Sequence, residues 1–191
     1  MSSLISSPSC AGAGVLPLVS EGREDSIVSA EKLTVEVGSV AIRAINASVG
    51  WSGYDRSIVS GLEIAIKSAG ASSVFLFHKT HDTLDGFVIV ENTGRGTGYI
   101  PFIAVDQTSQ KKGVGSALML AAIEKIKLLG FKYLMFDYRN SGGRPHFYSE
   151  TIPTKAHVGV LEMRLAGEYS NGDPRMHILY DLFPKPEEKA S

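Results

Sequence analysis

A short turn rich in glycine and lysine is the feature that most constrains how this chain can fold. It reads Gln110-Lys111-Lys112-Gly113-Val114-Gly115-Ser116, and it joins an apolar run at residues 99–105 to an amphipathic run at residues 114–129. Glycines let a backbone approach a ligand closely. The first N–H groups of a helix are unpaired and lie at the positive end of its dipole. The order strand, basic turn, helix therefore predicts a site for a phosphorylated cofactor.

Composition limits the kinds of protein that could carry such a site. The chain has 191 residues, 43% of them hydrophobic and 20% charged, which is typical of a single globular domain. The formal net charge of −1 gives no reason to expect nucleic acid or an anionic membrane as the main partner. Lys111 and Lys112 are thus a local feature that suits a small anionic ligand.

The ends of the chain and its single cysteine predict organisation and location. Residues 1–30 are rich in small residues and have no basic residue before Arg23, so we expect a flexible tail; a cleaved targeting segment is the weaker alternative. The domain is expected at residues 31–184, with a second tail at 185–191. Cys10 alone cannot form an intramolecular disulfide, and no run of about 18 apolar residues exists, which favours a cytoplasmic protein.

Hydrophobic periodicity predicts the first elements. Leu33, Val35 and Val37 alternate with polar residues, which favours a short strand. Residues 40–45 could be a second strand or the start of a helix. Apolar residues at helical spacing after the capping sequence at 52–55 predict a helix that ends at Gly70.

The later elements follow a clearer pattern. Residues 73–78 and 87–91 predict a hairpin, and residues 99–105 a strand buried on both faces, with a bulge or an edge position at Pro101. A helix at 114–129 and a strand at 133–138 come next. An irregular segment then precedes a hairpin of 161–169 with 176–182, which has Asn171-Gly172 at its turn. The mixture predicts an α+β fold with a mixed, mostly antiparallel central sheet flanked by helices.

Three kinds of phosphate-binding turn can be compared with this one. A dinucleotide fingerprint would use Gly113 and Gly115, with Asp137 on the ribose, but Leu118 occupies the third glycine position and seven residues separate the strand from Gly113. A Walker-type loop needs its lysine after the last glycine, and here the lysines come first. A long loop of backbone N–H groups that wraps the pyrophosphate of an acyl-CoA is the third interpretation.

The turn resembles the Gln/Arg-x-x-Gly-x-Gly/Ala signature of the GCN5-related N-acetyltransferase (GNAT) superfamily. The flanking sequences Ile103-Ala104-Val105-Asp106 and Ser116-Ala117-Leu118 are also similar to that family. So are Asn140, the pair Phe147-Tyr148 and the carboxyl-terminal hairpin, and the likeness extends over residues 33–182. The resemblance implies a GNAT-like acyltransferase fold and transfer of an acetyl or other acyl group from acyl-CoA, as co-substrate, to an amine.

The same resemblance implies roles for particular residues. Tyr148 would be the catalytic acid that protonates the CoA thiolate, with Tyr138 as the alternative. The backbone of the turn would bind the pyrophosphate, and two residues of the preceding strand and an asparagine would bind the pantetheine arm. The implied cofactor-binding residues are Ile103, Val105, Gln110, Lys111, Lys112, Gly113, Val114, Gly115, Ser116 and Asn140.

The general base is left open. Family members often use a glutamate on the central strand, but residues 99–105 contain no carboxylate, so Asp106, Glu91 and His146 are the candidates. The alternative is that water deprotonates the amine or that the amine binds as the free base. About ten residues, 149–158, intervene before the next strand and would either shape the acceptor pocket or form a plain loop. We expect the acceptor to be recognised around residues 51–54 and 141–158.

Other expectations concern partners. The acceptor would be a small-molecule or peptide amine, a homodimer is one expected assembly, and no nucleic acid, membrane or metal is expected. His78 and His81 form a weak metal-like pair that we interpret as part of a surface hairpin. Two alternatives remain: a CoA-binding regulatory protein that has lost catalysis, and an NAD(P)-dependent oxidoreductase.

Overall fold

The computed structural model describes residues 25–50, 52–67, 73–140, 144–170 and 172–185. The described residues form one seven-stranded sheet in the order β1-β2-β3-β4-β5-β7-β6. Its strands are β1 (Asp25–Ser29), β2 (Ser73–Thr80), β3 (Thr83–Asn92), β4 (Thr97–Val105), β5 (Tyr133–Arg139), β6 (Gly159–Glu168) and β7 (Pro174–Asp181). Among these seven described strands, only β4 and β5 are neighbours that run parallel to each other. The predicted mixed, mostly antiparallel α+β fold is thereby confirmed.

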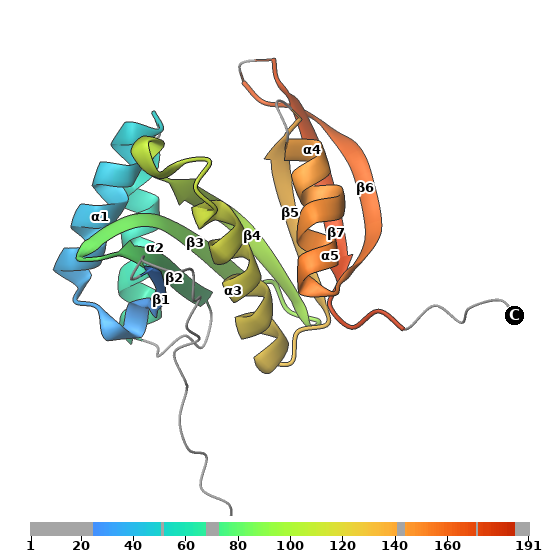
Figure 1. Cartoon of the computed structure of the whole chain (residues 1–191), viewed down its shortest axis with the longest axis horizontal. Coiled ribbons are helices and arrows are strands. Elements are labelled where there is room, and N and C mark those ends of the chain that lie inside the picture. Colours follow the sequence, from blue (N-terminus) through green and yellow to red (C-terminus); the bar gives the residue numbers. More distant parts are fainter. Residues whose placement is uncertain (1–24, 51, 68–72, 141–143, 171, 186–191) are drawn as a thin grey trace, which may run out of the picture.

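Helices cover both faces of the sheet (Figure 1). Helices α1 (Val35–Ser48) and α2 (Asp55–Lys67) pack on one face, against Phe75, Phe77, Phe87 and Ile89. Helix α3 (Val114–Leu128) packs on the other. The same face carries a continuous helical segment made of α4 (Arg144–His146), a π-helical turn η4 (Phe147–Thr151) and α5 (Ile152–Ala156). We call these the α1/α2 face and the α3 face.

The amino-terminal expectations need two corrections. Residues 25–29 are not part of a tail, because β1 pairs with β2 from Asp25 opposite Thr80 to Ser29 opposite Leu76. Residues 33–37 are not a strand, because α1 begins at Val35. The Thr34 hydroxyl caps this helix by accepting from the N–H of Val37 at 3.2 Å. Residues 40–45 are therefore helical, and residues 1–24 lie outside the described residues.

The expectations for the hairpins and for helices α2 and α3 are confirmed. The hairpins β2–β3 and β6–β7 form, and α2 and α3 lie close to their predicted ranges. Gly70 and Asn171 fall outside the described residues. The predicted irregular segment is helical instead: Ile152 and Ala156 are buried on the α3 face, and the Lys127 ammonium donates to the Ala156 carbonyl at 2.9 Å.

The pairing of β4 with its two neighbours sets up the site. Opposite β3, Ile100 and Pro101 together face the single residue Val90, so a β-bulge lies at Pro101, as predicted. Opposite β5, pairing runs only from Thr97–Tyr133 to Ile100–Phe136. Beyond this point the two strands diverge, so β4 is not buried on both faces, and only Gly98, Ile100 and Ala104 of its nine residues are buried.

Candidate active site

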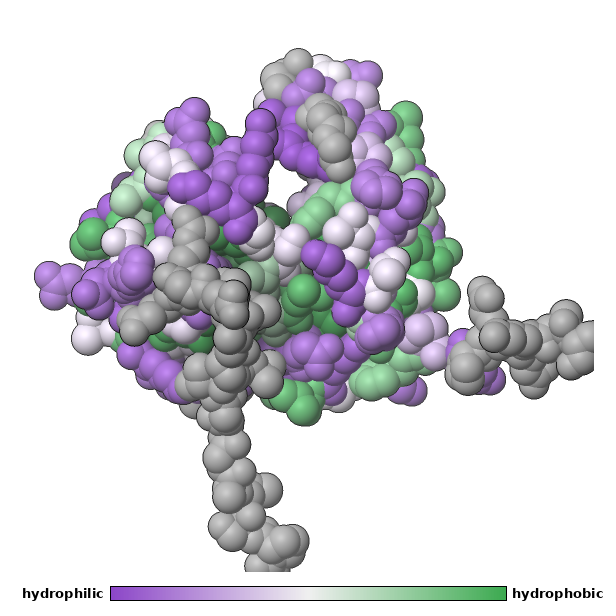
Figure 2. All heavy atoms as spheres, in the orientation of Figure 1, coloured by the Kyte–Doolittle hydropathy of each residue, from purple (hydrophilic) through white to green (hydrophobic). Residues whose placement is uncertain are grey.

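A cleft opens where β4 and β5 separate. In Figure 1 the two strands form a V, and Figure 2 shows the molecule hollowed between its two halves above α3. Antiparallel β3 holds β4 on one side of the cleft, and antiparallel β7 holds β5 on the other. The edges of β4 and β5 that face each other past Ile100 and Phe136 make no ladder bonds with each other. Backbone groups at these two edges are available to an extended ligand.

The turn predicted to bind the cofactor forms one wall of this cleft. Gly113 is the residue that precedes α3 and has a left-handed φ of 92°, while Lys111 is left-handed at 61°. No side chain in the described part of the chain caps α3, and the first internal bond of this helix is donated by Ala117 to the Gly113 carbonyl at 3.0 Å. The N–H groups from Gly113 to Ser116 therefore have no partner within the helix, which is the geometry that binds phosphate.

Neighbouring groups hold this turn in place. The Gln110 amide donates to the Val105 carbonyl at 3.2 Å, and the Asp106 carboxylate accepts from the Thr108 N–H and hydroxyl at 2.9 and 2.6 Å. The Thr108 hydrogen bond is the largest of several effects that lower the pKa of Asp106. Asp106 therefore caps the turn and is a weak base, which argues against the catalytic role considered for it.

The two lysines and the residues expected to bind the pantetheine arm lie on both sides of the cleft. Lys111, Lys112 and Gln110 are exposed, and Val114 is buried against the sheet. Ile103 and Val105 lie on β4 past the bulge and are half-buried. Asn140 directly follows β5, across the cleft, and its backbone N–H donates to the Pro174 carbonyl at 2.9 Å.

Tyr148 lies beside the cleft apex on the α3 face. Its ring packs on Phe136, Tyr138 and Phe147 with centroids 5.0, 4.8 and 4.8 Å away, and the Tyr180 hydroxyl donates to the Tyr148 carbonyl. Phe136 is the last β5 residue paired with β4, so the ring flanks the point of divergence. Burial raises the pKa of Tyr148 to about 12, which keeps the phenol protonated at neutral pH.

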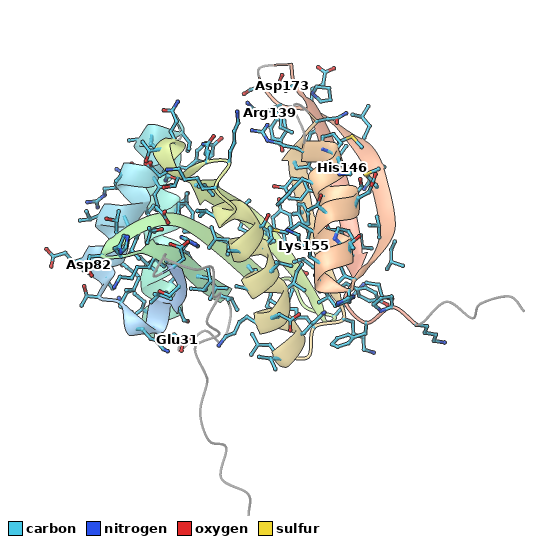
Figure 3. The ribbon with its side chains drawn as sticks, viewed as in Figure 1. Glu31, Asp82, Arg139, His146, Lys155 and Asp173 are labelled. Atoms are coloured by element: carbon cyan, nitrogen blue, oxygen red, sulfur yellow. The ribbon has the colours of Figure 1, made fainter. Side chains whose placement is uncertain are left out.

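The other catalytic candidates have different surroundings. Tyr138 is buried, and its hydroxyl contacts the Met163 sulfur at 3.4 Å. Glu91 is exposed at the end of β3. His146 is 70% exposed on α4, where Nδ1 lies 3.2 Å from the Glu150 carboxylate. Figure 3 labels His146 and Lys155 on the helical segment that covers β5 and β7.

The two histidines of the His-x-x-His pair have separate environments. His78 is buried rather than on a surface, and its Nδ1 lies 2.7 Å from Asp85, which also accepts from the Thr80 hydroxyl at 2.9 Å. His81 is exposed in the turn between β2 and β3. No group of three or more His, Cys, Asp or Glu within the described ranges could hold a metal ion.

The structure also brings together a pair that sequence reasoning missed. Asp137 on β5 and His177 on β7 are directly opposite each other, and the Asp137 carboxylate lies 2.9 Å from His177 Nδ1. Asp137 immediately follows Phe136, so it is the first residue of β5 past the last pair with β4. Its side chain alternates with those of Phe136 and Tyr138 and therefore belongs to the α1/α2 face. The hairpin signal at residues 171–172 could have found the pair only if the neighbour of β5 had been known.

Solved structures that share this fold include several acetyltransferases. Ard1 from Thermoplasma volcanium has a TM-score of 0.62 and 18% identity over 84% of this chain and 99% of its own. The ribosomal-protein-S18-alanine N-acetyltransferase of Escherichia coli has a TM-score of 0.59 and 15% identity, over 86% of this chain and 97% of its own. PaiA N-acetyltransferase from Thermoplasma acidophilum, solved with coenzyme A, has a TM-score of 0.55 and 16% identity, over 81% of this chain and 98% of its own. At these identities the likeness shows a GNAT acetyltransferase fold.

The sequence itself identifies the family. The model of the acetyltransferase (GNAT) family matches residues 46–148, more than half of the chain, and this protein belongs to that family. The matched range includes the turn, the bulged strand and Tyr148. An acyl-CoA co-substrate fits the family and its CoA-bound members. No curated protein matches the sequence significantly. Among the described residues, no helix is long and apolar enough to cross a membrane.

Proposed function

We propose that this protein transfers an acetyl or other acyl group from acyl-CoA to an amine by direct attack. One observation carries the proposal: the cleft between β4 and β5 leads from the start of α3 to the partly buried ring of Tyr148. The N–H groups of Lys111 to Ser116 would bind the pyrophosphate. The pantetheine arm would lie along the edge of β4 at Ile103 and Val105, with Asn140 across from it, as a strand added to the sheet.

Tyr148 would act as the acid. The amine nitrogen attacks the thioester carbonyl and forms a C–N bond, and collapse of the tetrahedral intermediate breaks the C–S bond. The thiolate that leaves takes the phenol proton of Tyr148, which solvent then restores. Because burial holds the pKa near 12, the phenol is protonated at the start of each turnover and has a proton to give as the thiolate leaves.

The acceptor side of the cleft favours an amine that approaches from the α1/α2 face. Tyr54, which follows α1, packs its ring 5.6 Å from that of Phe102 on the diverging part of β4. Arg139 and Asp173 form an ion pair at 3.1 Å at the outer end of the other half, as Figure 3 shows. A small-molecule amine and a peptide amino terminus both fit this open arrangement; the Escherichia coli relative is named for an alanine of ribosomal protein S18.

Thermal shift and turnover would test the proposal together. Acetyl-CoA and CoA should raise the melting temperature and NAD should not. Thiol should then be released from acetyl-CoA across a panel of small amines, lysine peptides and peptides with free amino termini. Stabilisation by NAD alone would refute the proposal. CoA binding without thiol release for any amine would favour the alternative, a CoA-binding regulatory protein, which the absence of a carboxylate on β4 supports.

The partner that we propose besides the amine is a second copy of this chain. β6 is the last strand of the sheet and exposes Leu161, Met163 and Leu165 by 55%, 47% and 62%. Green atoms at the edge of Figure 2 lie over this strand. An antiparallel pair centred on Met163 would bring Leu161 opposite Leu165 of the second copy, and Glu162 opposite Arg164. The strand is thus complementary to itself in both apolar and charged positions.

Light scattering after gel filtration would test this assembly. The native chain should elute as a dimer, and Met163→Glu should give a monomer, because it buries two carboxylates at the axis. Leu128→Glu is the control, since Leu128 is exposed by 84% on α3. Glu162→Arg alone should weaken the dimer, and adding Arg164→Glu should restore it. A monomeric native chain would exclude the dimer.

We also propose that the protein is located in the cytoplasm and that neither nucleic acid nor a membrane is a partner.

A further inference from the structure

The pair Asp137–His177 lies on the opposite side of the cleft apex from Tyr148. Phe136 and Tyr138, which flank Asp137 along β5, contact the Tyr148 ring on the α3 face. Asp137 and His177 occupy the other face, and their side chains are 24% and 19% exposed. One titratable group is therefore on each side of the point where β4 and β5 part. A thioester inserted at this apex would have the phenol on the α3 face and the Asp137–His177 pair on the α1/α2 face, with Asp137 on the strand that borders the cleft and His177 on the next strand.

The hydrogen bond between Asp137 and His177 determines which nitrogen of the imidazole carries the proton. The Asp137 carboxylate at 2.9 Å from Nδ1 accepts a hydrogen bond, which makes Nδ1 the protonated nitrogen and leaves Nε2 with its lone pair. β7 holds His177 in register with Asp137, and β6 places Arg164 opposite His177 on the other side. Both partners lie on paired strands rather than loops, so the imidazole is held in position before a substrate arrives.

Charged and titratable groups surround the pair on every neighbouring element. They are Glu91 on β3, Tyr99 on β4, Arg139 on β5, Arg164 on β6, Tyr169 in the β6–β7 turn and Arg175 on β7. Burial, and then the Asp137 charge, raises the pKa of both Tyr99 and Tyr169. The carboxylate charge thus reaches β4 and the β6–β7 turn, which are the two walls that an amine on this face would touch.

We propose that His177 is the general base that removes a proton from the acceptor ammonium, and that Asp137 is the positioning residue that orients it. This inference rests on the proposed acyl transfer. His177 Nε2 takes one proton from the ammonium, and the neutral amine attacks the thioester carbonyl. The C–N bond forms, the nitrogen gives its second proton to solvent, and the C–S bond breaks. His177 then returns its proton to solvent, while Tyr148 protonates the thiolate.

The rate as a function of pH separates a base from a structural residue. For His177→Gln, we expect kcat/KM at pH 7 to fall by about 10²–10⁴-fold, the usual worth of a positioned base. The deficit should shrink as the pH rises toward the pKa of the acceptor, because the free amine then forms without help. Asp137→Asn should give a smaller loss with the same trend. CoA affinity, measured by calorimetry, should stay within about twofold for both variants.

A matched control and a separate binding measurement keep the outcomes distinct. His81→Gln removes a histidine that is exposed in the turn between β2 and β3, far from the proposed base in the sheet order, and should leave the pH profile unchanged. If the native chain is active and His177→Gln matches it, or loses activity equally at every pH, this inference is wrong and the acyl transfer stands. If the native chain binds CoA but releases no thiol with any amine, the proposed function fails, and this inference fails with it.

Discussion

Single residues in this protein have roles that their neighbours determine. Tyr148 and Tyr138 illustrate the point, since both belong to one aromatic cluster and their ring centroids are 4.8 Å apart. The Tyr138 hydroxyl contacts Met163, while the carbonyl of Tyr148 is anchored by Tyr180. Sequence reasoning could name both as possible acids from the motif. It could not rank them, because the contacts come from β6 and β7, which are distant in the chain.

Replacing Tyr148 by phenylalanine tests the acid directly. The ring contacts remain and only the phenol proton is lost, so we expect kcat to fall by about 10²–10³-fold while CoA affinity is kept. Stopped assays of thiol release, with calorimetry for CoA, would measure the two effects. Tyr138→Phe serves as the comparison and should lose less than about fivefold at similar stability. A larger fall of kcat in Tyr138→Phe than in Tyr148→Phe would show that Tyr138, and not Tyr148, is the acid.

The buried pair His78–Asp85 should make the free energy of unfolding depend on pH in the acidic range. Burial acts to raise the pKa of Asp85, but hydrogen bonds from His78 and Thr80 outweigh it and leave the pKa below its usual value. A lowered pKa contributes stability that is present above about pH 4 and is lost as the pH falls through the native value. Asp85→Asn should lose roughly 1–3 kcal/mol at pH 7 and show a flatter decline toward pH 3.

Urea unfolding at several pH values would check this expectation. The urea concentration at the midpoint of unfolding should fall steeply below about pH 4 for the native chain, and it should not do so for Asp85→Asn. Parallel curves for the two proteins would show that the Asp85 carboxylate does not carry the acid sensitivity.

At the scale of elements, the sequence predicted what local signals specify. The hairpins and the helices α2 and α3 follow from turn residues, caps and periodicity. The strand expected at residues 33–37 failed because a three-residue alternation also fits one turn of an amphipathic helix, and the Thr34 cap decided between them. β1 was missed because its stability comes from pairing with β2, which lies far along the chain.

The contact between β3 and α3 links packing to the cofactor turn. A Cβ on Gly86 would lie 2.9 Å from Leu118 Cδ1, 3.0 Å from Val114 Cγ1 and 3.2 Å from the Ala104 carbonyl. Val114 begins α3 and its branched side chain is stiff, so the helix start must move. Gly86→Ala should therefore destabilise the fold by about 1–3 kcal/mol and weaken CoA binding.

Thermal unfolding and CoA calorimetry would measure both losses. Gly53→Ala is the matched control, because a Cβ added to Gly53 would meet nothing within 4 Å. A Gly86→Ala variant with reduced stability and native CoA affinity would show that the turn does not depend on this contact.

At the scale of the molecule, the sequence predicted the fold class, which is confirmed, and proposed one contiguous turn for the cofactor, but it missed the Asp137–His177 pair. The turn at residues 110–116 is contiguous, so a motif reveals it. The proposed acceptor side would be assembled from β4, β5, β7 and the connection after α1, and no local pattern in the sequence specifies which of these become neighbours. The order β5-β7-β6 brings His177 to Asp137 across 40 residues of sequence.

The divergence of β4 and β5 has a further consequence for motion. Four residue pairs, from Thr97–Tyr133 to Ile100–Phe136, are the only ladder that joins the two halves of the sheet among the described strands. A pantetheine arm bound between β4 and β5 would connect the two halves and restrict their motion relative to each other. Amide hydrogens of β4 and β5 near the apex should therefore exchange with deuterium rapidly in the free protein and slowly once CoA is added, while those of the β2–β3 hairpin keep their rates.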